Sequence, residues 1–131
     1  MSQTTTLILL PQTAYHNPGN GAPYNVVGDP QPAASYYLGN KDLQTVNINL
    51  SNCTGNVFIQ ASLNNPIIVG DDTQWFNVYE LDANANSSSS SDPFANSNAS
   101  VYTNIVGNFV YLRAVVQDFQ GGVVNFVKLS Y

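Results

Sequence analysis

The stretch NFVYLRAVVQDFQGGVVNFVKLSY, residues 108–131, decides the fold because two apolar, β-rich runs flank the pair Gly121 and Gly122. Two glycines in such a setting supply the positive φ angles of a tight type I′ turn, so the stretch predicts a β-hairpin. With the glycines as its loop, alternate residues of the two strands form one continuous apolar face. The cross-strand pairs expected on that face are Val116–Val127, Ala114–Leu129 and Leu112–Tyr131.

The second face of this predicted hairpin is mixed in character, which indicates that something covers part of it. Its interface candidates are Tyr111, Arg113, Phe126 and Lys128. In the predicted register Arg113 and Lys128 are diagonal neighbours, close enough to act as one positive spot. Two interpretations are open: the cations pair internally, with Asp118 or Glu80 as partner, or they meet acidic groups of another subunit.

Length and composition restrict the class of protein. A chain of 131 residues is long enough for one domain with a real core. Only 8% of its residues are charged and its net charge is −5, so it has too few cations to favour nucleic acid or an anionic membrane as partner. Cys53 is the single cysteine, which excludes an internal disulfide. The first residues lack the basic and apolar regions of a signal peptide, so assembly in a cytoplasm is expected.

The chain in order predicts a single all-β domain over residues 1–131. Apolar and polar residues alternate, or β-rich runs occur, over residues 4–10, 45–50, 57–63, 74–81 and 101–106, in addition to the C-terminal stretch. A turn around Gly55 makes residues 57–63 the antiparallel partner of residues 45–50. No segment shows helical periodicity. About eight short strands are typical of an antiparallel β-sandwich, here of jelly-roll type.

Two segments interrupt this pattern. Residues 11–35 contain five prolines, repeated glycines and scattered tyrosines, without periodicity. Long loops of this kind are functional or disordered, so Tyr15 and Tyr24 are interface candidates that anchor an extended arm on another subunit. The alternative is a loop that covers its own domain. Residues 82–100 are rich in Asn and Ser, have little to bury, and predict a flexible loop.

No arrangement of residues favours catalysis. His16 is the only histidine and lies in the Pro-rich segment, and no nucleophile motif surrounds any serine. Glu80 is the only glutamate, and a glycosidase would require a second carboxylate such as Asp71 or Asp72, both of which read as turn residues. The sequence therefore predicts a protein that is not an enzyme and has no catalytic residues and no cofactor.

A metal site is also not expected. Asp82, Asn84 and Asn86 copy the first three ligand positions of a calcium loop. The pattern then fails, because Ser87 stands where the loop needs glycine and Pro93 where it needs a bidentate glutamate.

Carbohydrate binding is an open alternative. Sugar-binding sandwich domains use aromatic faces and neutral amides, and this chain has one tryptophan, eight tyrosines and abundant asparagine. An aromatic residue in a strand is nevertheless more often part of the core, and that is the expected role of Trp75.

Several runs in the second half resemble the small β-sandwich structural proteins of large tailed bacteriophages, of the marine cyanobacterial myophage type. They are GNVFIQASL (55–63), WFNV (75–78), VGNFVYLRA (106–114), FQGGVV (119–124) and VKLSY (127–131). In the pattern they resemble, one strand ends in the run aromatic–aliphatic–Arg–Ala. A turn containing glycine then leads into the last strand of the chain. The resemblance covers residues 46–131 and leaves the N-terminal third unmatched.

This resemblance implies a virion component without enzymatic activity. We therefore expect a decorating or accessory protein of the capsid or tail, assembled in the host cytoplasm. It would act through contacts with capsid or tail proteins or with copies of itself. The alternative is a carbohydrate-binding module used for attachment to a host or a glycan.

Overall fold

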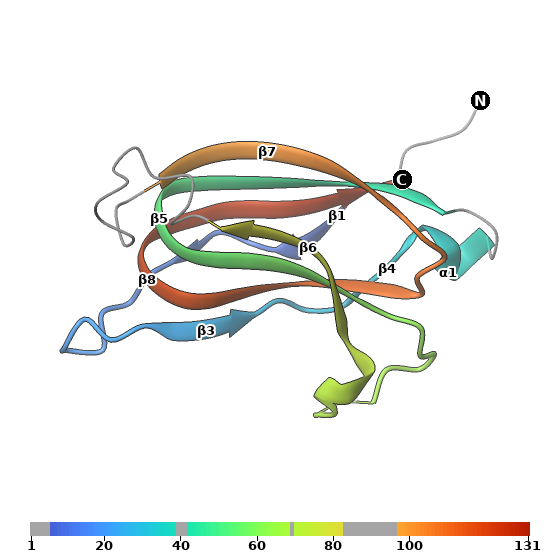
Figure 1. Cartoon of the computed structure of the whole chain (residues 1–131), viewed down its shortest axis with the longest axis horizontal. Coiled ribbons are helices and arrows are strands. Elements are labelled where there is room, and N and C mark those ends of the chain that lie inside the picture. Colours follow the sequence, from blue (N-terminus) through green and yellow to red (C-terminus); the bar gives the residue numbers. More distant parts are fainter. Residues whose placement is uncertain (1–5, 39–41, 69, 83–96) are drawn as a thin grey trace.

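The computed structural model describes residues 6–38, 42–68, 70–82 and 97–131, and Figure 1 shows its elements. In chain order they are β1 (Thr6–Leu10), β2 (Thr13–Ala14), β3 (Tyr24–Val27), β4 (Gln31–Pro32), α1 (Ala34–Leu38), β5 (Leu43–Ser62), the 3₁₀ turn η1 (Asp72–Gln74), β6 (Phe76–Asp82), β7 (Ser97–Val106) and β8 (Tyr111–Ser130). The predicted all-β class with eight antiparallel strands is confirmed. The five-residue helix α1 was not predicted, and no helix in the described ranges is long enough to cross a membrane.

Two 20-residue strands, β5 and β8, form the centre of the sheet and pair antiparallel along nearly their whole length. The register runs from Thr45 opposite Ser130 at one end to Ser62 opposite Tyr111 at the other. Both strands bend at the same end of the molecule, where their pairing shifts register (Figure 1). One continuous sheet is thereby folded into two layers that face each other.

Each layer contains half of β5 and half of β8. The upper layer consists of β7, residues 43–51 of β5, residues 123–130 of β8, β1 and β2. The lower layer consists of β6, residues 56–62 of β5, residues 111–117 of β8, β3 and β4. This arrangement fits the expected sandwich of two layers, while the jelly-roll topology stays a prediction.

The two predicted hairpins are wrong. Residues on the two sides of Gly121–Gly122 do not pair with each other: Val116 lies opposite Val57 in the lower layer, and Val127 opposite Ile48 in the upper layer. In the same way, the turn predicted around Gly55 is a bend within β5 rather than a loop between two strands. Glycine provides positive φ both in a turn between two strands and in a bend within one strand. The glycines in the sequence therefore do not distinguish the two structures.

The bends of β5 and β8 lie against each other and form one corner of the molecule. Left-handed φ angles occur at Asn52 (50°) and Gly55 (144°) in β5, and at Asp118 (56°) and Gly122 (79°) in β8. A Cβ atom at Gly122 would lie 2.0 Å from the carbonyl oxygen of Asn52. Glycine is therefore required at this position both for its φ angle and for the close approach of the two backbones.

The core lies between the two layers and is built from alternate residues of β5 and β8. Fully buried side chains from these strands are Val46, Ile48, Val57, Ile59, Ala61, Leu112, Ala114, Val116, Phe119, Val124, Val127 and Leu129. The apolar residues expected to face inward are buried, but the strand pairs expected for them are wrong, because β5 and β8 pair with each other. The pairing of β5 with β8 shifts register at three places near the corner, and there the inward residues of each strand change from even to odd numbers.

Cys53 lies at the corner with no exposed surface, and this burial raises the pKa of its thiol to about 11. The thiolate is the reactive form of cysteine, so we expect native protein at pH 8 to resist labelling by a thiol reagent. Labelling should become fast once the chain is unfolded in denaturant. Stoichiometric labelling of native protein within minutes would contradict the buried corner.

The Pro-rich segment of residues 11–35 packs on its own domain, which is the second of the two interpretations given above. Its strands β2, β3 and β4 all pair with β8. Tyr15 and Tyr24 stack with ring centroids 5.4 Å apart, and both contact the buried ring of Phe119 edge-on at 5.7 and 5.8 Å. The two tyrosines are thus partly buried in this chain rather than presented on a free arm.

Both ends of the loop predicted over residues 82–100 are strand residues. Asp82 belongs to β6, and residues 97–100 belong to β7, where they pair with β5. The rest of the predicted loop, including Asn84, Asn86, Ser87 and Pro93 of the incomplete calcium pattern, lies outside the described residues.

Candidate functional site

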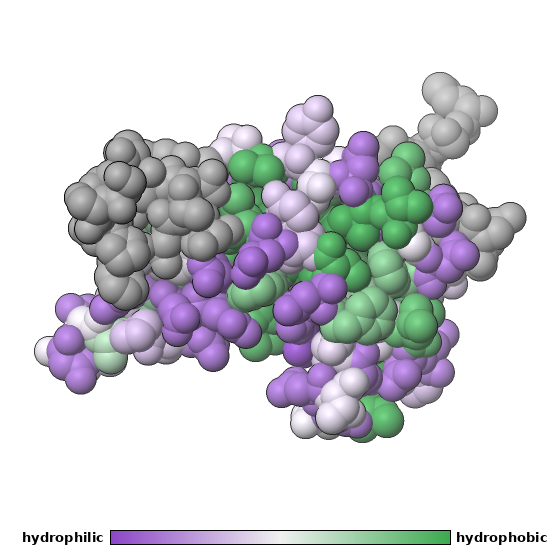
Figure 2. Space-filling view, in the orientation of Figure 1, coloured by the Kyte–Doolittle hydropathy of each residue, from purple (hydrophilic) through white to green (hydrophobic). Residues whose placement is uncertain are grey.

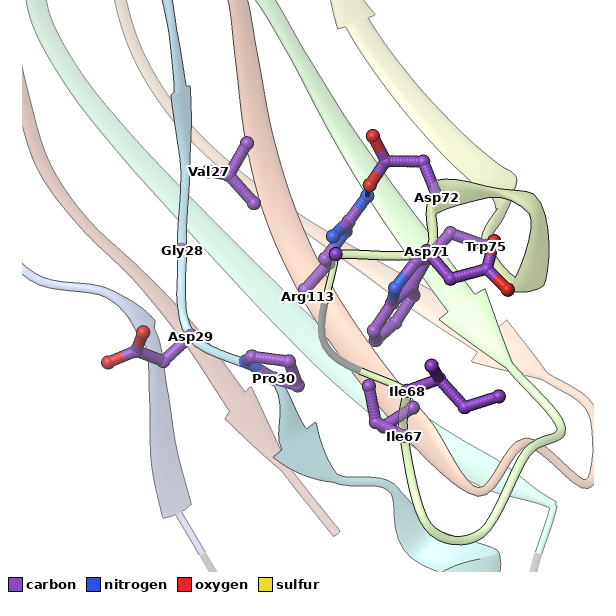
Figure 3. A pocket seen from close by; sticks show the side chains of 11 residues that line it. Val27, Gly28, Asp29, Pro30, Ile67, Ile68, Asp71, Asp72, Trp75 and Arg113 are labelled. Carbon is purple, nitrogen blue, oxygen red and sulfur yellow. Dashed lines mark hydrogen bonds and ion pairs between the residues drawn. The ribbon is translucent and has the colours of Figure 1, made fainter.

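A groove on the outer face of the lower layer is the candidate site, and Figure 3 shows the larger of its two cavities. The two adjoining cavities have volumes of about 330 and 280 Å³ and share Val27, Asp72 and Arg113. We call this site the Arg113 groove. The larger cavity is also lined by Gly28, Asp29, Pro30, Ile67, Ile68, Gly70, Asp71 and Trp75, and the smaller one by Asn25, Gln60, Val115 and Gln117.

Three parts of the chain that are distant in sequence meet at this groove. β3 and the residues after it form one wall, and the loop between β5 and β6 forms the other. β8 provides the floor, because Arg113, Val115 and Gln117 alternate on the face that points away from the core. Figure 3 shows Arg113 between Asp72 and Trp75, with Val27 and Pro30 across the cavity.

Gln74 holds the loop wall in place. Its amide nitrogen donates to the carbonyl oxygens of Ile68 (2.6 Å) and Asp71 (2.8 Å). Its amide oxygen accepts from the backbone N–H of Ile68 (3.1 Å) and the side chain of Asn64 (3.0 Å). One side chain therefore satisfies several backbone groups of a segment that has no strand partner, which gives the wall a defined shape.

Asp71 caps the 3₁₀ turn η1 at the rim of the groove. Its carboxylate accepts from the hydroxyl (2.5 Å) and the backbone N–H (2.9 Å) of Thr73. These two bonds, the hydroxyl bond first, lower the pKa of Asp71 below its ordinary value. The carboxylate therefore stays ionised at the groove under neutral and mildly acidic conditions.

Arg113 is held in a fixed orientation on the floor. Its Nε donates to Oε1 of Gln60 (2.8 Å), and Nε2 of Gln60 donates in turn to Oδ1 of Asn77 (3.0 Å). Its guanidinium lies 4.3 Å from the ring centroid of Trp75. The ion pair with Asp72 is longer, at 3.4 Å, and involves a carboxylate that is 87% exposed, so it contributes little. Gln60 and Trp75 thus position the cation.

The chemistry of the groove is that of recognition by hydrogen bonds. The guanidinium has five N–H donors, and the contacts above use its Nε and one terminal nitrogen. Amide side chains of Asn25, Gln60 and Gln117 add donors and acceptors in the smaller cavity. Three carboxylates and one guanidinium line the larger cavity, which gives it a negative net charge.

The structure separates the two cations that the predicted hairpin placed side by side. Arg113 lies opposite Gln60 in the lower layer, whereas Lys128 lies opposite Asn47 in the upper layer. The prediction of one positive spot is wrong because the hairpin does not form. Neither predicted carboxylate is the partner of Arg113, since Asp72 takes that place.

The other interface candidates are distributed over both layers. Lys128 places its ammonium 4.3 Å from the ring centroid of Phe126, on the outer face of the upper layer. Tyr111 begins β8 in the lower layer, and its ring lies 5.3 Å from that of Tyr36 in α1. Arg113 is therefore the interface candidate that lines the groove.

The residues considered for catalysis do not gather at one place. Asp71 and Asp72 line the groove, but Glu80 is exposed on β6 and His16 is exposed between β2 and β3. Within the described ranges, no three His, Cys, Asp or Glu side chains form a group that could hold a metal ion.

Trp75 has a different role from the one expected. It is half-buried, lies outside the core, and stacks on Arg113 at the groove wall. The amides of Gln60 and Gln74 were also not predicted as site residues. Gln60 lies on the polar face of its strand, so the sequence predicts that it is exposed. No pattern in the neighbouring residues indicates that it contacts Arg113.

Comparisons with known proteins show the fold. No protein-family model matches the chain, and no curated protein matches it. Among solved structures, the fold is similar to that of the SPBc2 prophage-derived protein YomS, with a TM-score of 0.50, 14% identity, and coverage of 98% of this chain and 91% of that chain. A lower TM-score of 0.44, at 12% identity and the same coverage, is found with CBM29_1, a family 29 carbohydrate-binding module from Piromyces equi.

Proposed function

We propose that this protein is a non-enzymatic structural component of a bacteriophage particle, and that it attaches to another particle subunit through the Arg113 groove. It would act as a decorating or accessory protein of the capsid or tail. The observation that carries the proposal is the fixed position of Arg113, held by Gln60 and Trp75 between two adjoining cavities.

Arginine and tryptophan are the residue types that most often dominate the energy of a protein–protein interface. Arg113 is mostly buried, with 12% of its side chain exposed, so a partner would bind it in a site that water already reaches poorly. Its orientation is set before binding, which lowers the entropy cost of forming the contact. The groove therefore fits a partner segment that offers a carbonyl or hydroxyl to the guanidinium.

The origin in a phage particle is supported by two further points. The sequence runs quoted above resemble small structural proteins of tailed phages. The fold is similar to that of a prophage-derived protein, which fits the same setting. The compositional argument against nucleic acid as partner also favours contacts with protein.

Replacing Arg113 by alanine tests the attachment. We expect Arg113→Ala to weaken co-sedimentation with phage particles at least about tenfold, because loss of an interface arginine costs about 1.4 kcal/mol or more. Arg113→Lys keeps the positive charge but loses the planar guanidinium group with its five N–H donors, so this variant should also bind weakly. Lys128→Ala is the matched control, because it removes the same charge from the opposite layer and should bind like the wild type.

A melting curve of each variant shows whether it is folded. If folded Arg113→Ala and Arg113→Lys both bind particles with the wild-type affinity, the groove is not the attachment surface.

Carbohydrate binding at the same groove is the second candidate. It is favoured by the three neutral amides of Asn25, Gln60 and Gln117, because neutral sugars are recognised through amide hydrogen bonds and aromatic surfaces. A glycan array separates the two functions. Binding of a glycan that is lost on Gln60→Ala and Gln117→Ala supports this candidate, whereas particle binding without any glycan signal supports attachment to protein.

A further inference from the structure

The folded sheet has four edge regions, and β7 differs from the other three. An edge strand exposes unpaired backbone groups that can pair with another chain, and proteins usually protect such edges with charge, proline or a bulge. β1 has five residues, contains a register shift, and ends at Pro11. β3 and β4 are short and flanked by prolines, and β6 carries Glu80 and Asp82.

β7 has neither a charged residue nor a proline. Its pairing with β5 shifts register between Leu50 and Cys53, but the extra residue there belongs to β5 and not to β7. Its sequence SNASVYTNIV is ten residues long and contains no proline and no charged residue. Among the described strands it pairs with β5 alone, so its other side is an open edge. Two large side chains on it are strongly exposed, Tyr102 at 74% and Val106 at 67%. Such an edge is a template for adding a further strand.

Apolar surface continues from this edge toward the lower layer. Figure 2, drawn in the same view as Figure 1, shows green side chains around and between the edges of β7 and β6. Phe76 is 40% exposed at the start of β6, and its ring lies 5.8 Å from that of the half-buried Phe109. Val78 and Val101 are also only partly buried. A contact at the β7 edge would remove some of this surface from water.

The charge distribution favours a second copy of this chain as the partner. In the described residues, the carboxylates of Asp29, Asp71, Asp72 and Glu80 belong to the lower layer and its loops. The upper layer carries Lys128, and it has the exposed Asp42 just before β5, beside the end of β7. Two copies that meet through β6 would bring Glu80 of each copy together, whereas β7 itself has no carboxylate to place across a two-fold axis.

We propose that β7 is a self-association edge, which pairs antiparallel with β7 of a second copy across a two-fold axis. A two-fold interface uses the same strand from both copies, so an uncharged strand places no like charges opposite each other. The pairing extends the upper layer of one copy into that of the other. A ten-residue strand supplies a long ladder for this contact.

The test is the oligomeric state of purified protein, measured by sedimentation equilibrium over a range of concentrations. The wild type should be a dimer. Tyr102→Lys with Val106→Lys should weaken the dimer about 100-fold or more, because it places like charges across the two-fold axis. Ile8→Lys is the matched control, since Ile8 is 41% exposed on β1 at the other edge of the upper layer and its replacement should leave the dimer intact.

A mixing experiment makes the test specific for the strand. Tyr102→Glu with Val106→Glu should also be monomeric, and an equal mixture of the Lys and Glu variants should form a heterodimer. A wild type that stays monomeric at the highest concentration would overturn the proposal. So would a Lys variant that dimerises like the wild type, or a mixture that fails to associate.

This inference is independent of attachment through the Arg113 groove. Tyr102 and Val106 do not line the groove, so a monomeric variant that still binds particles separates the two.

Discussion

Gly122→Ala should destabilise the protein by about 2–5 kcal/mol, measured as the free energy of unfolding in denaturant. Two costs add up in this figure. A residue with a Cβ atom is strained at the φ angle of 79° found here, at about 1–2 kcal/mol. The new atom would also lie 2.0 Å from the backbone oxygen of Asn52, which forces the two bends apart at a cost of about 1–3 kcal/mol.

Gly21→Ala is the control for this prediction. Gly21 has a similar φ of 70°, but no atom lies within 4 Å of the position where its Cβ would be. Its replacement should cost about 1 kcal/mol, from backbone strain alone. Equal losses for the two variants would mean that the bends of β5 and β8 do not approach each other as described.

Phe119→Ala should destabilise the protein by about 3–5 kcal/mol, the usual cost of removing a fully buried phenylalanine. Phe119 has no exposed surface and contacts Tyr15 and Tyr24 edge-on. Its loss removes the surface on which the Pro-rich segment rests, so limited proteolysis should cut between the two tyrosines faster than in the wild type.

Phe76→Ala is the matched control, because Phe76 is 40% exposed at the end of the sheet. We expect it to cost much less, about 1 kcal/mol. If the two phenylalanine variants have equal unfolding free energies, Phe119 does not anchor the segment.

The class of the fold follows from the sequence, but the pairing of its strands does not. Alternation of apolar residues identifies the inward faces of β5 and β8, because that period depends only on neighbouring residues. The glycines at 55 and at 121–122 indicate positive φ, and Gly55 and Gly122 have it. Whether such a residue ends a strand or bends it depends on the partner strand. Here the partner of each half lies between 49 residues (Ser62 to Tyr111) and 85 residues (Thr45 to Ser130) away.

The site was predictable only in part for the same reason. Arg113 was identified as an interface residue because cations are rare in this chain. Its contacts come from residues 53, 41 and 38 positions earlier in the chain, and no local pattern connects them. The prediction that Lys128 is a neighbour of Arg113 depended on the C-terminal hairpin, and it is wrong because that hairpin does not form. Tyr15 and Tyr24 were expected to anchor an extended arm on another subunit, but in the structure they contact Phe119 of the same chain.

The claim that the Arg113 groove holds another particle subunit is tested most directly by photo-crosslinking in intact phage particles. A benzophenone side chain at Gln117 would lie in the groove, and one at Ile8, which is 41% exposed on β1, would lie on the outer face of the upper layer. After irradiation, we expect the protein labelled at Gln117 to be joined to a different particle subunit, and the protein labelled at Ile8 not to be joined to one. Crosslinking to another subunit from Ile8 but not from Gln117 would contradict it.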